Sequence, residues 1–77
     1  MEKRIREAII AYITAHEKSE VKEIWEHVSK KLNVTRYWVV SELDAMRLEG
    51  VVNRINDAGI LYYSIANQKF VLEKYLP

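Results

Sequence analysis

The sequence of 77 residues has no cysteine, and this absence excludes disulfide bonds, thiolate metal sites and cysteine nucleophiles. Gly50 and Gly59 are the only two glycines, so the chain has no glycine-rich loop that could hold a phosphate group. His16 and His27 are the only histidines, and neither belongs to a cluster with the spacing of metal ligands. We therefore expect no metal, no cofactor, no small-molecule ligand and no enzymatic activity.

Long apolar runs and a strong net charge are missing as well. No apolar stretch approaches the roughly 20 residues that a membrane-spanning helix needs, and the charged N-terminus lacks the pattern of a signal peptide. We therefore expect a soluble cytoplasmic protein without a membrane partner. The net charge is only +1, whereas dedicated nucleic-acid-binding proteins are often strongly basic.

The sequence contains three segments whose apolar residues recur at helical spacing. Its hydrophobic content of 49% is sufficient for a packed core in a single domain. The predicted helices cover residues 2–16, 20–32 and 35–49. Their apolar faces consist of Ile5, Ala8, Ile9, Tyr12 and Ile13 in the first, Val21, Ile24, Val28 and Leu32 in the second, and Val39, Leu43 and Met46 in the third.

The joints between these helices are short. Ser19 could cap the second helix, although residues 19–21 could instead form a brief strand that pairs with a later hairpin, and the sequence leaves both open. Asn33 tolerates the left-handed conformation that ends a helix, and Thr35 is a good N-cap for the third helix. Two helices joined this closely predict a helix-turn-helix, with an ordinary three-helix bundle as the alternative.

A β-hairpin is expected directly after the third helix. Gly50 stands where a left-handed residue often ends a helix. Two β-rich runs, 51–55 and 60–65, flank the turn-forming residues 56–59. This direct passage from helix to hairpin argues against an ordinary bundle. Residues 67–77 repeat apolar side chains at a spacing of four, which predicts a short terminal helix that either covers the core or pairs with a second subunit.

The most specific stretch is Val39-Val40-Ser41-Glu42-Leu43-Asp44-Ala45-Met46-Arg47-Leu48-Glu49-Gly50-Val51-Val52-Asn53-Arg54, followed by Asp57-Ala58-Gly59 and Tyr63-Ser64-Ile65. Together with the helices before it, this stretch resembles the winged helix-turn-helix family over about residues 5 to 65. The resemblance implies an α+β fold with a three-helix core, a C-terminal two-stranded β-hairpin wing and a short terminal helix. Small archaeal, plasmid and viral transcription regulators are the most similar class.

The resemblance also implies double-stranded DNA as the partner, with the outward face of the third helix in the major groove. That face is centred on Ser41, with Tyr37 and Trp38 beside it. The hydroxyl groups of Tyr37 and Ser41 can bond base edges or phosphates. Trp38 could contact a sugar or a thymine methyl group, or equally pack against the second helix or a partner subunit. The family usually carries several outward Arg, Lys, Gln or Asn residues here, whereas this helix has Val40 and Asp44.

Candidate phosphate contacts come from a window without acidic residues, from His27 to Ser41. Thr35 and Arg36 are candidates at the start of the third helix, near free backbone N–H groups that favour a phosphate. Lys30 and Lys31 end the second helix, where they equally suit compensation of the helix dipole.

In the wing, the resemblance assigns Arg54 to the adjacent minor groove or DNA backbone, with Asn53 and Asn56 as secondary candidates. Arg47, at the edge of the inward stripe, is expected to form a structural ion pair. We therefore expect a sequence-preferring DNA-binding transcription regulator that acts as a homodimer through its tail. The alternative is a winged-helix module that binds another protein.

Overall fold

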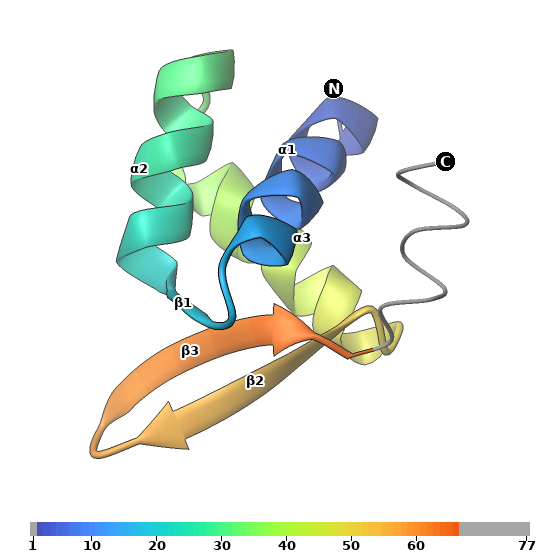
Figure 1. The fold of residues 1–77 in the computed structure, drawn as a ribbon. Helices are drawn as coiled ribbons and strands as arrows, with labels where there is room; N and C mark the ends of the chain where they lie inside the picture. Colours follow the sequence, from blue (N-terminus) through green and yellow to red (C-terminus); the bar gives the residue numbers. More distant parts are fainter. Residues whose placement is uncertain (1, 67–77) are drawn as a thin grey trace.

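The computed structural model describes residues 2–66, which form a small α+β fold of three helices and a three-stranded antiparallel sheet. The helices pack together, and the sheet projects from one end of them as a long hairpin (Figure 1). The elements are α1 (Glu2–Ala15), β1 (Ser19–Glu20), α2 (Val21–Leu32), α3 (Arg36–Leu48), β2 (Val52–Asp57) and β3 (Ile60–Ile65). The three predicted helices are confirmed to within one residue at each end.

The buried core lies where the three helices meet the base of the hairpin. Every helix contributes the apolar stripe that its periodicity predicted, and α1 adds Ile10, which is also fully buried. Val51, Val52 and Tyr63 close the core from the side of the hairpin. The inward side chains of α3 pack against α1, α2 and β2. The opposite face of α3 is therefore held toward solvent.

The joint between α2 and α3 has the two predicted residues at its cap positions, Asn33 at the end of α2 and Thr35 at the start of α3. Asn33 adopts the left-handed conformation at the end of α2, with φ 55° and ψ 46°. Thr35 occupies the N-cap of α3, and its backbone carbonyl accepts hydrogen bonds from the N–H groups of Trp38 and Val39. The Thr35 side chain makes no capping hydrogen bond, so the residue acts through its extended backbone conformation rather than through its hydroxyl oxygen.

Residues 19–20 form a strand, which decides between the two alternatives that the sequence left open. Ser19 pairs with Tyr63 and Glu20 with Tyr62, so β1 lies beside β3 and the strand order is β1-β3-β2. The predicted two-stranded sheet therefore has a third strand. Glu20, not Ser19, is the N-cap of α2, and its backbone N–H donates to Glu23 Oε1 at 2.9 Å.

The turn of the hairpin is shorter than the four residues expected. Asp57 pairs directly with Ile60, so only Ala58 and Gly59 connect the strands. Both have positive φ, 54° and 84°, as a type I′ turn requires. The Asn56 side-chain oxygen accepts a hydrogen bond from the Gly59 N–H at 3.1 Å and supports the turn.

The predicted terminal helix, residues 67–77, lies outside the described residues. Within residues 2–66, no helix combines the length and the apolar character that crossing a membrane requires.

Candidate nucleic-acid interface

The outward face of α3 carries the large exposed hydrophobic side chains of the described helices. Tyr37, Trp38 and Leu48 expose 70%, 51% and 78% of their surface, whereas Val39, Leu43 and Met46 on the opposite side are fully buried. Ser41 is exposed at the centre of this face, as the periodicity predicted. The exposed side chains of α3 are therefore available to a ligand while its buried side chains stay packed in the core.

Trp38 and Tyr37 contact each other on this face. Their ring centroids are 5.5 Å apart and the ring planes meet at 78°, which is an edge-to-face arrangement. Trp38 is thus partly supported by its neighbour but still half exposed. The structure brings both predicted aromatic residues to the same surface as Ser41.

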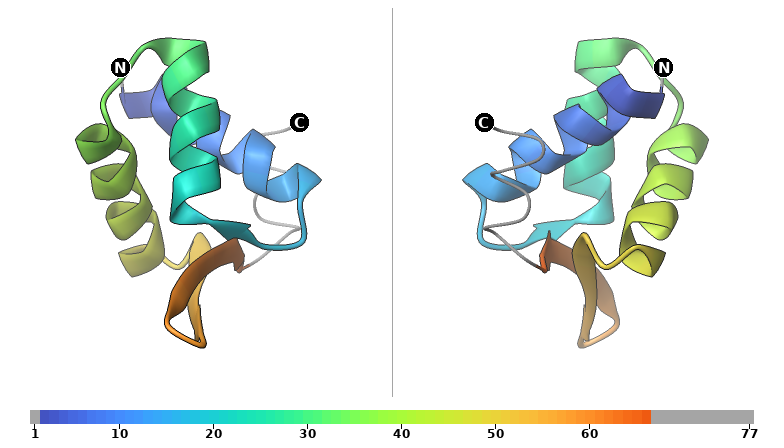
Figure 2. Two further views of the ribbon diagram at one scale, coloured as in Figure 1. Left: turned by 90° about the vertical axis from the view of Figure 1, so that its left-hand side faces the viewer. Right: turned by 90° about the vertical axis from the view of Figure 1, so that its right-hand side faces the viewer.

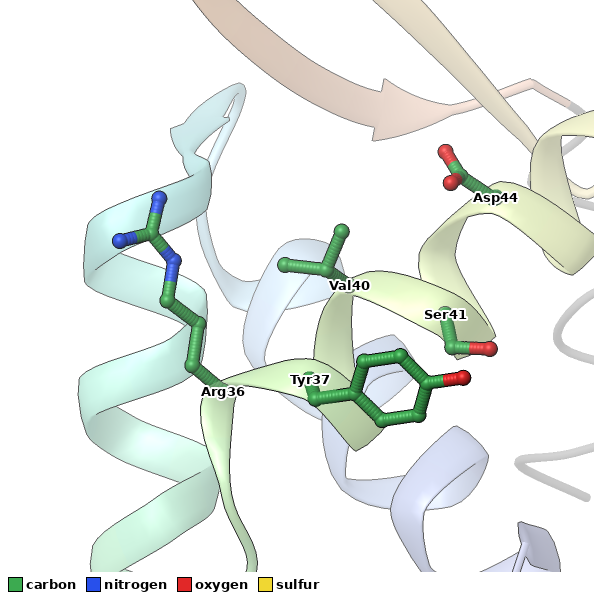
Figure 3. Close-up of a pocket in the computed structure, with 5 residues that line it drawn as sticks. All are labelled: Arg36, Tyr37, Val40, Ser41 and Asp44. Atoms are coloured by element: carbon green, nitrogen blue, oxygen red, sulfur yellow. The ribbon is translucent and has the colours of Figure 1, made fainter.

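A hollow on the surface of α3 is lined by Arg36, Tyr37, Val40, Ser41 and Asp44. Figure 3 shows Val40 between Arg36 and Asp44, while Tyr37 and Ser41 point to another side of the helix. The lining therefore combines a cation, two hydroxyl groups, an apolar side chain and a carboxylate within about two turns of one helix.

A second hollow shares Arg36, Val40 and Asp44 with the first and extends to the hairpin. We call the two together the α3–hairpin groove. Its remaining lining residues come from the start of α2 and from the hairpin: Glu20, Val21, Lys22, Arg54, Gly59, Ile60, Leu61 and Tyr63. One continuous surface therefore joins the exposed face of α3 to the hairpin.

Strand register explains why Arg54 faces this groove. Arg54 lies opposite Tyr63, whose side chain is buried toward the helices, and directly paired residues project on the same face of an antiparallel sheet. Successive residues of a strand point to opposite faces, so Asn53 projects away from the groove. Asn56 shares the face of Arg54, but its side-chain oxygen is used in the turn. Of the three candidates in the hairpin, Arg54 is the one best placed beside α3.

Arg36 does not extend freely from the first turn of α3. Its guanidinium carbon lies 5.8 Å from the centre of the Trp25 ring, a cation–π contact between α3 and α2. Figure 3 shows the side chain lying along α2. The contact keeps the charge at the edge of the α3–hairpin groove.

Lys30 and Lys31 are exposed in the last turn of α2, at the end of that helix away from the hairpin (Figure 2). Between the start of α2 and these lysines the helix rises about 14 Å. They therefore lie apart from Arg54, and neither lysine is among the lining residues of the α3–hairpin groove. Lys22, which the sequence reasoning missed, lies at the hairpin end and lines the groove. Pairing of β1 with β3 brings the start of α2 next to the hairpin, so recognising residues 19–20 as a strand would have placed Lys22 there.

The groove also contains two acidic residues, Glu20 and Asp44. Arg36, Arg54 and Lys22 bring three positive charges to the same lining, so the local balance is +1. Across residues 2–66 there is no group of three or more histidine, aspartate or glutamate side chains that could hold a metal ion. The groove therefore offers charged and hydrogen-bonding side chains to a ligand.

Comparison with known proteins found no matching family model, no matching curated protein and no matching solved structure.

Proposed function

We propose that this protein binds double-stranded DNA with a sequence preference and acts as a transcription regulator. The observation that supports the proposal is the continuity of the α3–hairpin groove, which places the exposed face of α3 and Arg54 on one surface. Three helices followed by a hairpin agree with the layout of a winged helix, in which α3 is the recognition helix and the hairpin is the wing.

The dimensions and side chains of α3 suit the major groove. A B-DNA major groove is about 12 Å wide and admits one α-helix. Ser41 at the centre of the exposed face is small, so the helix backbone can approach the base edges. The hydroxyl groups of Tyr37 and Ser41 can both donate and accept hydrogen bonds there.

The positive charges around the groove would contact the phosphate backbone on either side of α3. Arg54 would approach from the hairpin, and Lys22 and Arg36 from the α2 side. Attraction between exposed charges is screened beyond about 8 to 10 Å at cellular salt, so a local cluster matters more than the net charge of the chain. A protein with a net charge of +1 can therefore still bind DNA through this surface.

A fluorescence-anisotropy titration of labelled duplex DNA tests this proposal. Three phosphate contacts per subunit predict a slope of about −3 per subunit, doubled for a dimer, when the logarithm of the association constant is plotted against the logarithm of salt concentration. A folded protein that binds no duplex at about 50 mM salt, where such contacts are strongest, would contradict the proposal.

A second candidate function is the binding of another protein. The exposed Tyr37, Trp38 and Leu48 favour it, because aromatic residues are enriched in protein interfaces and charged ones are depleted at interface centres. The titration separates the two: DNA affinity that falls steeply with salt supports a nucleic-acid surface, and its absence supports a protein-binding one.

We also propose that the protein is a homodimer through residues 67–77, whose apolar residues repeat at a spacing of four. Sedimentation velocity over a range of protein concentrations tests this, with and without those residues. A dimer that becomes a folded monomer on truncation supports the proposal. A full-length monomer at every concentration contradicts it.

A further inference from the structure

Asp44 is the acidic side chain on the exposed stripe of α3 itself. It follows Val40 by four residues and lies on the same side of the helix as Val40, with Ser41, three residues before it, on the adjoining side. The side chain is half-buried and lines both parts of the α3–hairpin groove. Figure 3 shows it on the opposite side of Val40 from Arg36.

Within residues 2–66, the structure shows no hydrogen bond or ion pair that engages the Asp44 carboxylate. The ion pairs of the described residues join Arg6 to Glu42, Arg6 to Glu49 and Lys18 to Asp57, all outside the groove. Asp44 is thus not occupied in holding the fold together. Its acceptor oxygens are available to a ligand in the groove.

A free carboxylate on a DNA-binding helix weakens binding to every sequence unless a donor on the DNA meets it. Phosphates repel it, and most groups at the edges of the major groove are acceptors. The donors there are the N4 amino group of cytosine and the N6 amino group of adenine. A favourable contact for Asp44 must therefore be an exocyclic amino group.

We propose that Asp44 is a specificity-determining residue that selects cytosine at one position of the DNA site, by accepting a hydrogen bond from its N4 amino group. The inference rests on the proposed DNA-binding function and names which base this part of the groove reads. Cytosine is favoured over adenine because adenine presents the N7 acceptor beside its amino group, and N7 repels a carboxylate.

The position read by Asp44 is distinct from the one that Tyr37 faces. The two residues are seven positions apart in the sequence, which corresponds to a rise of about 10 Å along the helix. Successive base pairs of B-DNA are about 3.4 Å apart, so the two side chains meet different base pairs. Loss of the Asp44 contact should therefore relax the sequence preference at one position and leave it at the others.

The test is selection from a pool of randomised DNA duplexes, followed by affinity measurements on the enriched sequence and its single-base variants. The proteins compared are the wild type, Asp44→Ala, Asp44→Asn and the control Asp57→Asn. Asp57 lies at the tip of the hairpin and is exposed, so the control changes the net charge by the same amount outside α3. Circular dichroism verifies that each variant is folded.

The wild type should prefer cytosine by about 5- to 150-fold at one position. Asp44→Ala should lose that preference and bind random duplex at least as tightly as the wild type. Asp44→Asn should change the preferred base from cytosine to adenine, because an amide can bond both N6 and N7 of adenine. Asp57→Asn should keep the wild-type preference.

An enriched sequence that is the same for the wild type and both Asp44 variants would overturn the role of Asp44 and leave DNA binding established. Salt-sensitive binding without any enriched sequence would also overturn it, because Asp44 would then select no base. Absence of binding to any duplex would overturn the proposed function as well.

Discussion

Arg6 on α1 and Glu49 at the C-terminal end of α3 form a bidentate ion pair, with nitrogen–oxygen distances of 2.8 and 2.9 Å. The Arg6 Nε also donates to Glu42, one helical turn after Trp38 on α3. A single guanidinium therefore connects α1 to α3 at two points, on the side of α3 away from the α3–hairpin groove. The pair helps to orient α3 without using any residue of the exposed face.

We expect Arg6→Met to lower the free energy of unfolding by about 1 to 3 kcal/mol, because it removes the ion pairs to Glu42 and Glu49 while keeping an apolar stem in place. The lower part of this range allows for Glu49, whose side chain is half exposed to water. Urea titration with an unchanged m value measures the loss. Lys18→Met, which breaks the exposed 3.8 Å pair with Asp57, is the control and should cost about 1 kcal/mol or less. Equal losses in the two variants would show that the Arg6 contacts add no stability.

The hairpin turn offers a stabilising substitution. Ala58 has φ 54°, a conformation that asparagine tolerates better than alanine, and Asn-Gly is the preferred pair in a type I′ turn. Ala58→Asn should therefore raise the free energy of unfolding by about 0.5 to 1 kcal/mol. Ala58→Val should lower it, because a β-branched residue is strained at positive φ. Thermal unfolding midpoints measure both, and the opposite order of the two variants would disprove a type I′ turn.

Arg54→Ala tests the hairpin as a nonspecific DNA contact. The variant should weaken binding to specific and random duplexes alike, and should reduce the salt slope by roughly one per subunit. Arg4→Ala removes the same charge from the exposed surface of α1 and should leave the slope unchanged. An identical effect of both variants would mean that only net charge matters.

The double substitution Tyr37→Phe and Ser41→Ala tests the recognition helix. Removing both hydroxyl groups should reduce the preference for the selected sequence by about 1 to 3 kcal/mol per lost base contact. Binding to random duplex should remain nearly the same, because the phosphate contacts are retained. If the ratio of specific to random affinity does not change, these hydroxyl groups read no bases, and the preference arises from DNA shape or from other residues.

The helices could be predicted from the sequence because their apolar stripes depend only on local periodicity. Val39, Leu43 and Met46 fix which side of α3 is buried, and hence which side is exposed. Asn33 and Gly50, both with positive φ, mark the ends of α2 and α3 through a preference that is equally local. The orientation of the candidate surface was therefore predictable from spacing alone.

Features that depend on contacts between distant segments were not predictable in the same way. The pairing of β1 with β3 joins residues more than 40 positions apart, and it determines that Lys22 lies at the groove. Sequence reasoning assigned a structural ion pair to Arg47. Among residues 2–66 the Arg47 Nε is buried without a hydrogen-bond partner, and Arg6 forms the interhelical pairs instead. Both residues lie near the edge of an apolar stripe, so periodicity could not distinguish them.

The short β1 strand fixes the hairpin at its base and leaves its outer part projecting from the helices. The strand pairs with β3 only at Tyr62 and Tyr63. The span from Asn56 to Leu61 is supported by pairing within the hairpin and by the exposed ion pair between Lys18 and Asp57. Residues 56–61 are all exposed, so a tilt of this span about the base of the hairpin would widen or narrow the α3–hairpin groove without involving a core residue. The width of the gap between α3 and the hairpin thus depends on a span that contributes no residue to the core, and a ligand between them would have to match that width.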